Sequence, residues 1–249
     1  MKIALVQLDA NDKLWSCQHI PDLLIASKGA DLVVFPELMP FDKTGRHAIP
    51  IAQACEVLSA YSTSEIAFIA GGYVRDNNVA RNAAFLAYDG AIHGTYFKRI
   101  RWQEEPIQVG QSGVCFTWGP GFACIPLICA DAADNPSPVG TQMMHEAIQL
   151  GADADTPIVI PSYGAGLATP IWQEPLQLWA MGCGAPVAIC GISGRSKSTY
   201  QEDGITNHYG GGGSGVFWPN GSRTRQSSKR GIYIVDTVTH RYEYRPIRV

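Results

Sequence analysis

The chain has 249 residues, of which 19 are basic and 22 acidic, so its formal net charge is −3. Because 46% of the residues are hydrophobic and only 16% are charged, the chain has enough apolar material for a buried core, which excludes intrinsic disorder. The negative net charge argues against a nucleic acid as partner. No stretch reaches the roughly 18 apolar residues of a membrane helix, and Asp9 interrupts the apolar run that a signal sequence needs. The sequence therefore predicts a soluble, cytoplasmic protein that binds neither nucleic acid nor membrane.

The distribution of the cysteines also indicates the cytoplasm. The chain has seven of them, an odd number, and most lie in apolar runs such as FACIPLIC (122–129) and PVAICGI (186–192). Reduced cytosolic thiols are distributed in this way.

Short aliphatic and aromatic runs predict strands along the whole chain. In chain order these runs are KIALVQL (2–8), DLVVF (31–35), EIAFIAGGYV (65–74), the two arms of RNAAFLAYDGAIHGTYFKRI (81–100), VCFTW (114–118), FACIPLIC (122–129), PIVIPS (157–162), PVAICGI (186–192), SGVFW (214–218) and GIYIVD (231–236). The segment 81–100 predicts a hairpin that turns at Asp89-Gly90.

Apolar residues at helical spacing predict four helices between these strands. They cover 21–29, 47–62, 140–152 and 170–185. The first opens at Pro21 with Gly29 as its C-cap, and the second is interrupted by Pro50. From Arg195 to Gly213 the polar, glycine-rich sequence predicts a loop. With no linker or repeat to divide the chain, this alternation predicts one α/β sandwich domain spanning 1–249.

Reactive side chains stand at the ends of three predicted strands. Cys129 closes FACIPLIC, Glu37 follows DLVVF between two prolines, and Lys98 closes GTYFKRI after an aromatic pair. Strand ends are where α/β proteins place reactive groups. A thiol needs a base to become a nucleophile, and a cation can hold both that carboxylate and a developing oxyanion. The set therefore predicts nucleophilic chemistry.

Each of these residues also has an ordinary structural interpretation. A cysteine that closes a buried strand is usually a small hydrophobic side chain. A glutamate at a strand end often caps a loop or pairs with arginine, and a lysine after Tyr-Phe often extends to solvent. The combination of the three, not any one of them, favours a catalytic site.

The chain resembles the nitrilase superfamily of carbon–nitrogen hydrolases over nearly its whole length. The glutamate, lysine and cysteine motifs of that family match LVVFPEL (32–38), YFKRIRW (96–102) and PLICADAADNP (126–136) in the same order. Supporting matches are RNAAFLAYDG (81–90), LGADADTPIVIPS (150–162) and GGGSGVFWPNG (211–221).

The resemblance implies an α/β/β/α sandwich that pairs into a four-layer assembly. It implies Cys129 as nucleophile, Glu37 as general base and Lys98 as stabiliser of the tetrahedral intermediate. A second site glutamate falls on Glu105 or, less well, on Glu104. We expect substrate-binding contributions from these residues: Ala130 through its backbone N–H, Trp102, Glu104, Asp131 and Tyr163.

Some positions depart from the family pattern. Ala130 follows the cysteine where an aromatic residue or Asn is usual, and the next proline comes late, at Pro136. The helix LQLWAMGCGA (176–185) lacks the usual arginines and the final Glu-Asn pair. These departures leave the three catalytic residues in place, but they prevent assignment to a subfamily.

Other motifs indicate no cofactor. GAGLAT (164–169) lacks the third glycine of a dinucleotide fingerprint, and Gly210–Gly213 leads into a strand and not into the helix that a phosphate site needs. Cysteines and histidines lack metal-ligand spacing, so we expect no metal. The basic segments SGRSKS (193–198) and SRTRQSSKR (222–230) have no interleaved aromatic residues and are typical of solvated loops.

The sequence thus favours hydrolysis by water of a non-peptide carbon–nitrogen bond in a small amide or carbamoyl compound, through a cysteine thioester that releases ammonia or an amine. Three alternatives stay open. One is hydrolysis of a nitrile by the same residues, and another is a catalytically silent binding member of the fold. The third is a Cys-His hydrolase of another fold with His145 or His208 as base.

Two further expectations concern surfaces. The low charge content predicts a homodimer or larger homo-oligomer with a helical interface that includes Met143, Met144, Leu176 and Trp179. Four acids near the catalytic residues predict an acidic mouth that favours neutral or cationic substrates, with the open alternative that they pair with Arg99 and Arg101 and leave the pocket neutral. These acids are Glu104, Glu105, Asp131 and Asp134.

Overall fold

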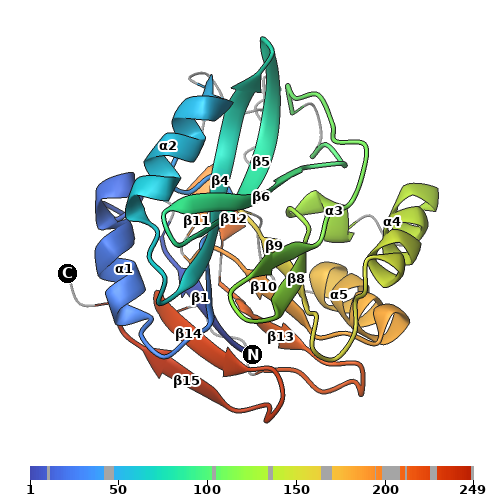
Figure 1. Ribbon diagram of the computed structural model, residues 1–249. Helices are drawn as coiled ribbons and strands as arrows, with labels where there is room; N and C mark the ends of the chain where they lie inside the picture. The colour runs from blue at the N-terminus through green and yellow to red at the C-terminus, as the bar shows by residue number, and fades with distance from the viewer. Residues whose placement is uncertain are drawn as a thin grey trace.

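The computed structural model describes residues 1–9, 12–41, 48–102, 105–133, 137–163, 170–193, 195–197, 208–210, 212–224 and 229–247. These residues form two large β-sheets packed face to face, with helices on both outer faces (Figure 1), and a separate sheet of two strands. The predicted α/β/β/α sandwich is therefore confirmed.

The larger sheet has the strand order β15-β14-β1-β2-β4-β5-β6, with the short β3 beside β4. Its strands are β1 (Lys2–Gln7), β2 (Leu32–Val34), β3 (Ile49–Pro50), β4 (Ala67–Asp76), β5 (Val79–Tyr88), β6 (Ala91–Phe97), β14 (Gly231–Asp236) and β15 (Tyr242–Arg245). β2 and β4 are parallel, and β5 and β6 follow as an antiparallel meander. The carboxyl ends of β2 and β6 therefore lie at the same edge of the sheet.

The smaller sheet has the order β13-β10-β9-β8-β7. Its strands are β7 (Phe116–Trp118), β8 (Phe122–Pro126), β9 (Ile158–Pro161), β10 (Val187–Cys190) and β13 (Gly215–Phe217). β8, β9 and β10 are parallel, so their carboxyl ends also share one edge.

The helices form the outer layers. They are the 3-10 helix η1 (Cys17–His19) and the α-helices α1 (Ile20–Ala26), α2 (Ile51–Tyr61), α3 (Ala130–Ala133), α4 (Pro138–Gln149) and α5 (Pro170–Cys183). α1 and α2 cover the larger sheet, and α4 and α5 cover the smaller one (Figure 1). Among the described residues, no helix is long and apolar enough to cross a membrane.

Alternation along the strands divides the core in two. In β1, Ile3 and Leu5 pack in the cluster between the sheets, whereas Ala4 and Val6 pack in the cluster under α1 and α2. Successive side chains of a strand point to opposite faces, so a strand covered on both sides reads as an unbroken apolar run.

Three details of the sequence prediction were wrong. α2 begins after Pro50 instead of being interrupted by it, because a proline before the first turn costs no backbone hydrogen bond. The C-cap of α1 is Ser27, and Gly29 lies two residues later with φ +95°. The predicted loop 195–213 contains β11 (Arg195–Lys197) paired with β12 (His208–Gly210). These strands pair through backbone hydrogen bonds, and their sequences lack the apolar run from which a strand is predicted.

The predicted helical interface also needs correction. Met143 is only 2% exposed, and Leu176 and Trp179 are completely buried within the chain. These side chains face the smaller sheet because they form the apolar stripe that holds α4 and α5 in place. Among the described side chains of the two helices, the exposed large apolar residues are Val139, Ile148, Leu178 and Met181.

Candidate active site

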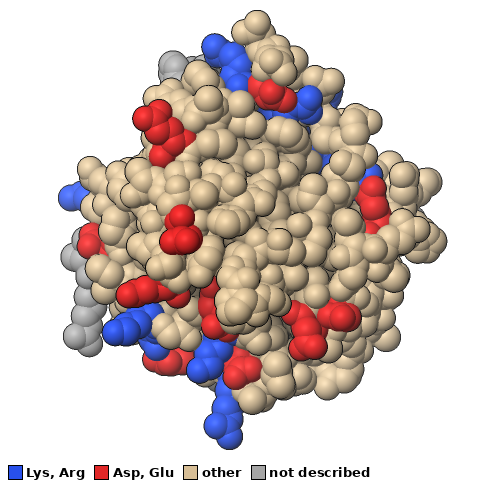
Figure 2. All heavy atoms as spheres, in the orientation of Figure 1, with Lys and Arg blue, Asp and Glu red and all other residues tan. Residues whose placement is uncertain are grey.

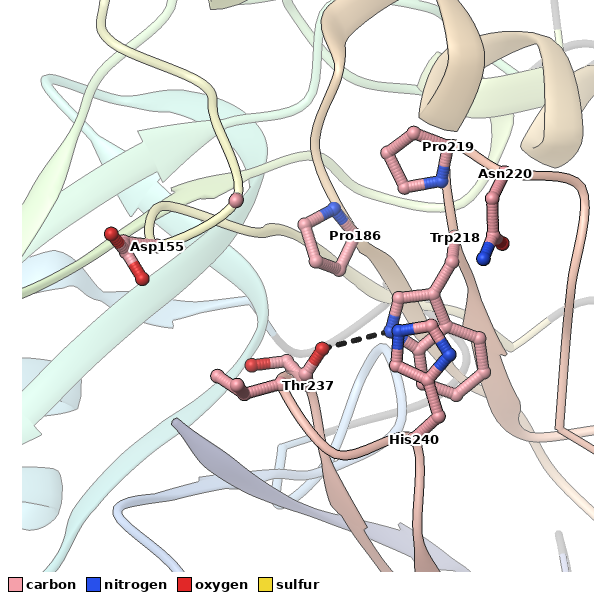
Figure 3. A pocket seen from close by; sticks show the side chains of 9 residues that line it. Asp155, Pro186, Trp218, Pro219, Asn220, Thr237 and His240 are labelled. Carbon is pink, nitrogen blue, oxygen red and sulfur yellow. Dashed lines mark hydrogen bonds between the residues drawn. The ribbon is translucent and has the colours of Figure 1, made fainter.

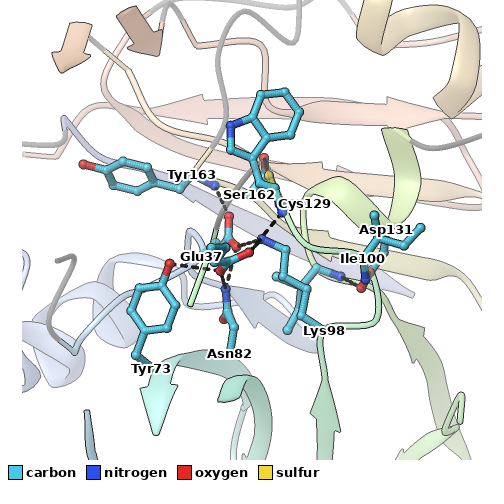
Figure 4. Close-up of polar contacts among 12 residues, drawn as sticks. Glu37, Tyr73, Asn82, Lys98, Ile100, Cys129, Asp131, Ser162 and Tyr163 are labelled. Atoms are coloured by element: carbon cyan, nitrogen blue, oxygen red, sulfur yellow. Dashed lines mark hydrogen bonds and ion pairs between the residues drawn. The ribbon is translucent and has the colours of Figure 1, made fainter. Parts of the chain in front are cut away.

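The predicted catalytic residues meet where the two sheets face each other. Glu37 follows β2 and Lys98 follows β6 of the larger sheet, while Cys129 follows β8 of the smaller sheet (Figure 4). Cys129 has φ +44°, a left-handed conformation that is rare for a residue with a side chain. This conformation turns the chain sharply between β8 and α3, with Cys129 at the turn.

Lys98 lies between two carboxylates. Its Nζ is 2.8 Å from Oε1 of Glu37 and 2.9 Å from Oε2 of Glu105, and all three side chains are buried. Burial alone would lower the pKa of Lys98, but the charges of Glu37 and Glu105 hold this pKa well above its usual range. Burial also opposes ionisation of Glu105, yet Lys98 lowers the pKa of that carboxyl. The cluster therefore contains a permanent ammonium at neutral pH.

Two further side chains fix the carboxylates. Nδ2 of Asn82 donates to Oε1 of Glu37 at 2.8 Å and to Oε1 of Glu105 at 3.0 Å. The hydroxyl of Tyr73 donates to the same oxygen of Glu105 at 2.9 Å. Sequence reasoning assigned neither residue a role, although a polar Asn82 within the apolar run of β5 is a signal of a buried polar contact.

Cys129 is held from both sheets. Oγ of Ser162, at the end of β9, donates to Sγ of Cys129 at 3.3 Å. Burial is the main cause that raises the pKa of the thiol well above its usual range, and Glu37 adds to it by charge and a hydrogen bond. Lys98 and the Ser162 hydroxyl act in the opposite direction. The resting sulfur is thus a thiol beside a carboxylate that can accept its proton.

Tyr163 reaches the cluster through its backbone. Its N–H donates to Oε2 of Glu37 at 2.9 Å, so both oxygens of that carboxylate have partners. The ring packs edge-on against Trp15, with ring centroids 5.7 Å apart. Tyr163 therefore lies beside Glu37, and its contribution to substrate binding stays a prediction.

The other predicted substrate-binding residues have different positions. Ala130 is buried and begins α3 directly after Cys129. The backbone N–H of Trp102 donates to Oε2 of Glu105 at 3.2 Å, while its side chain is 38% exposed. Glu104 lies outside the described residues.

Asp131 does not offer its carboxylate to solvent, which corrects the expectation that it lines an acidic mouth. The residue is completely buried and accepts hydrogen bonds from the hydroxyl of Tyr96 and from the backbone N–H groups of Ile128, Arg99 and Ile100. Burial raises the pKa of Asp131 to about 6, although these bonds and Lys98 favour its ionised form.

Glu105 does not line the expected acidic mouth either, because it is 3% exposed and its carboxylate pairs with Lys98. Asp134 and Glu104 lie outside the described residues. On the face shown in Figure 2, acidic and basic side chains are scattered among neutral ones and form no patch of one sign.

Neither of the alternative bases, His145 and His208, contributes a described side chain to the cluster around Lys98. His145 is exposed on α4, and the side chain of His208 lies outside the described residues, as does the segment 164–169. Within the described ranges, no group of three or more His, Cys, Asp or Glu side chains is arranged to hold a metal ion.

A hollow of about 300 Å³ lies at the other end of the parallel strands (Figure 3). Its lining includes Asp155 ahead of β9 and Pro186 ahead of β10, whereas Cys129 and Ser162 follow the opposite ends of the strands. The Trp218 ring stacks on His240 with centroids 4.2 Å apart, and its Nε1 donates to the carbonyl of Thr237 at 2.9 Å. None of the predicted site residues lines this hollow.

The fold is similar to those of known carbon–nitrogen hydrolases. An amidase from Nesterenkonia sp. AN1 is 23% identical with a TM-score of 0.70, over 95% of this chain and 92% of the amidase. Saccharomyces cerevisiae Nit3, of branch 10 of the nitrilase superfamily, is 17% identical with a TM-score of 0.73, over 98% and 89%. A carbon–nitrogen hydrolase from Helicobacter pylori is 18% identical with a TM-score of 0.72, over 94% and 87%.

Structures of the Nesterenkonia amidase include the product of Michael addition of acrylamide at its active-site cysteine and a complex with butyramide. No protein-family model matches the present chain, and no curated protein sequence matches it. The structural matches show that the chain has the nitrilase-superfamily carbon–nitrogen hydrolase fold over nearly its full length.

Proposed function

We propose that residues 1–249 form one catalytic domain that hydrolyses the carbon–nitrogen bond of a small amide or carbamoyl compound through a thioester at Cys129. The observation that carries this proposal is the buried arrangement of Glu37, Lys98 and Glu105 beside the Cys129 thiol. Burying three charged side chains is costly even when they are paired and hydrogen-bonded, so a cluster of this kind is more typical of a functional site than of a structural core. The similarity of the fold to an amidase supports the same reaction class.

The first half of the reaction forms the thioester. Sγ of Cys129 attacks the carbonyl carbon while Glu37 takes the thiol proton, so no free thiolate has to form in a site that disfavours it. The tetrahedral intermediate then expels the nitrogen as the carbon–nitrogen bond breaks. The proton held by Glu37 goes to this leaving group, which departs as ammonia or an amine.

Two donors stabilise the oxyanion in this proposal. The Lys98 ammonium keeps its charge because Glu37 and Glu105 hold its pKa high. The resemblance to the family implies the backbone N–H of Ala130 as the second donor. Such preorganised donors act in a buried site where water does not screen them.

The second half returns the enzyme to its starting state. Glu37 takes a proton from water, whose oxygen attacks the thioester carbon. The carbon–sulfur bond then breaks, and the proton returns to Cys129. One water is consumed, and the products are a carboxylic acid, or the carbamic acid equivalent, and the amine.

The site favours small substrates without a negative charge. Cys129 is 5% exposed and Lys98 is 2% exposed, which leaves little room for a bulky group at the reacting atoms. Glu37 and Glu105 together outweigh the charge of Lys98 by one negative charge, so a carboxylate near the reacting atoms would be repelled.

The proposal is tested with a panel of small amides, carbamoyl compounds and nitriles, assayed for ammonia release and for an acyl adduct by intact-protein mass spectrometry. We expect turnover of amides or carbamoyl compounds, and loss of both turnover and adduct in Cys129→Ala. Cys124→Ala, on β8 and five residues before Cys129, is the control and should stay active. Near-normal turnover in Cys129→Ala would disprove the assignment.

The same panel separates the alternatives. A nitrilase would release ammonia from nitriles in preference to amides. A silent binding protein would release none and form no adduct. A Cys-His hydrolase would lose activity when His145 or His208 is replaced, whereas we expect Glu37→Gln to abolish turnover.

A further inference from the structure

We infer that Asp131 is a positioning residue that fixes the distance between Lys98 and Cys129, the two groups that act on the same carbonyl. This inference deepens the proposed function and depends on it. Asp131 itself lies two residues after Cys129, with no hydrogen bond to the thiol among the described contacts. It acts through the backbone on either side of the catalytic residues.

The carboxylate joins two segments that are distant in sequence. Oδ1 accepts hydrogen bonds from the backbone N–H of Arg99 at 3.0 Å and of Ile100 at 2.8 Å, directly after Lys98. Oδ2 accepts from the N–H of Ile128 at 2.9 Å, directly before Cys129. The Asp131 side chain therefore holds the lysine segment (residues 98–100), which follows β6 of the larger sheet, against the cysteine turn (residues 128–131), which follows β8 of the smaller sheet (Figure 4).

The second oxygen has one more donor. The hydroxyl of Tyr96, two residues before Lys98 on β6, donates to Oδ2 at 2.8 Å. Both residues are buried, so water cannot replace a lost bond. The lysine segment is thus bound to Asp131 on both sides of Lys98.

The cysteine turn depends on the same residue. Cys129 has the left-handed φ of +44°, and the N–H of Asp131 donates to the carbonyl of Ile128 at 3.0 Å across it. A strained conformation persists only where its surroundings enforce it. The side-chain bond to the Ile128 N–H and this backbone bond together close the turn from both directions.

Asp131→Asn tests the inference with almost no change in shape. An amide can replace only one of the two oxygens as an acceptor, because its nitrogen is a donor. If the amide nitrogen takes the Oδ1 position, its N–H groups face the N–H groups of Arg99 and Ile100. If it takes the Oδ2 position, they face the N–H of Ile128. Either orientation releases one segment, so the variant separates Lys98 from its proper position relative to Cys129.

The experiment measures kcat and KM with the best substrate of the panel, and the rate of Cys129 alkylation by iodoacetamide, followed by peptide mass spectrometry. For Asp131→Asn we expect kcat to fall about 100-fold, as misplacement of about 1 Å does, with KM nearly unchanged and slower alkylation. The control is Asp236→Asn, at the end of β14: Val238 and Thr239 both donate to Oδ1 of Asp236, an acceptor that the amide oxygen of Asn can replace, so this variant makes the same Asp-to-Asn change without losing its bonds and should keep its kcat.

A folded Asp131→Asn protein with normal kcat, or with a change in KM alone, would overturn the inference. If this variant does not fold, Tyr96→Phe decides, because it removes one bond to Oδ2 and keeps the charge. We then expect kcat to fall about fivefold, by the loss of one hydrogen bond, and an unchanged kcat would overturn the inference. Absence of turnover and of adduct in the unaltered protein would overturn the proposed function, and this inference with it.

Discussion

Oγ of Ser162 donates a hydrogen bond to Sγ of Cys129 at 3.3 Å, and it does so from the strand next to the one that delivers the cysteine. The backbone continues this pairing, since the N–H of Cys129 donates to the carbonyl of Pro161 at 3.0 Å. Ser162 is completely buried. The sulfur therefore has a neutral donor on one side and the charged Glu37–Lys98 pair nearby.

We expect Ser162→Ala to lower kcat about fivefold, because a typical hydrogen bond of this kind contributes about 1 kcal/mol and its loss raises the pKa of the thiol further. Steady-state kinetics and the alkylation rate of Cys129 check this. The matched control is Ser27→Ala, another buried serine whose hydroxyl donates locally, to the carbonyl of Leu23 at 2.8 Å. Equal kinetics of the two variants would contradict a role of Ser162 at the sulfur.

Lys98→Met should reduce kcat by at least about 100-fold, since donors to an oxyanion contribute about 3–4 kcal/mol in comparable sites. It should also lower the free energy of unfolding by about 3–5 kcal/mol, because Glu37 and Glu105 lose the partner of a buried ion pair. Kinetics are measured well below the melting temperature, which is taken from circular dichroism. A loss confined to KM would argue against the oxyanion role.

The thiol of Cys129 should stay protonated from about pH 6 to about pH 9, because burial and Glu37 raise its pKa above the ordinary 9.0. The unfolded chain releases this proton more readily than the folded chain. The contribution of the group to stability is therefore present below the unfolded pKa and is lost as the pH rises above it.

The measurement is the ultraviolet absorbance of a thiolate, taken as the difference between the unaltered protein and Cys129→Ala across this pH range. We expect no step in the difference. A step centred near pH 7 would instead indicate a resting thiolate of the kind that a Cys-His pair forms.

Association through α4 and α5 should depend on Leu178 and Met181, which are 49% and 58% exposed. Placing a charge in an apolar interface is costly, so Met181→Lys should shift the protein toward the monomer in sedimentation velocity runs. Ile25→Lys is the control, because Ile25 is 72% exposed on α1 in the opposite outer layer. A 26.9 kDa species alone, for the unaltered protein at micromolar concentration, would contradict association.

The strands and the clustering of the principal candidate residues could be predicted because both depend on local sequence. Apolar runs mark buried strands, and Glu37, Lys98 and Cys129 each come shortly after one, so the strand directions within each sheet bring these residues to the ends of the strands that face one another. Asn82 and Tyr73 lie inside strands, where the sheet register decides which polar side chain faces the site. Local sequence does not contain that register.

The helix surfaces show the same limit. Leu176 and Leu178 are both apolar and two positions apart on α5, yet the first is completely buried and the second is 49% exposed. Only the rotation of the helix about its axis against the smaller sheet distinguishes them. Asp131 is a comparable case, because its sequence position beside Cys129 indicates proximity to the reaction and not the direction of its carboxylate.

If the proposed mechanism is right, the division of the candidate site residues between the two sheets makes activity a measure of how the sheets dock. Glu37, Asn82 and Lys98 belong to one sheet, and Cys129 and Ser162 to the other. A folding intermediate with both sheets formed but not yet joined would contain the strand hydrogen bonds of both sheets and lack the candidate site. Recovery of activity during refolding should therefore coincide with the last change in near-ultraviolet circular dichroism and follow the far-ultraviolet signal of the strands.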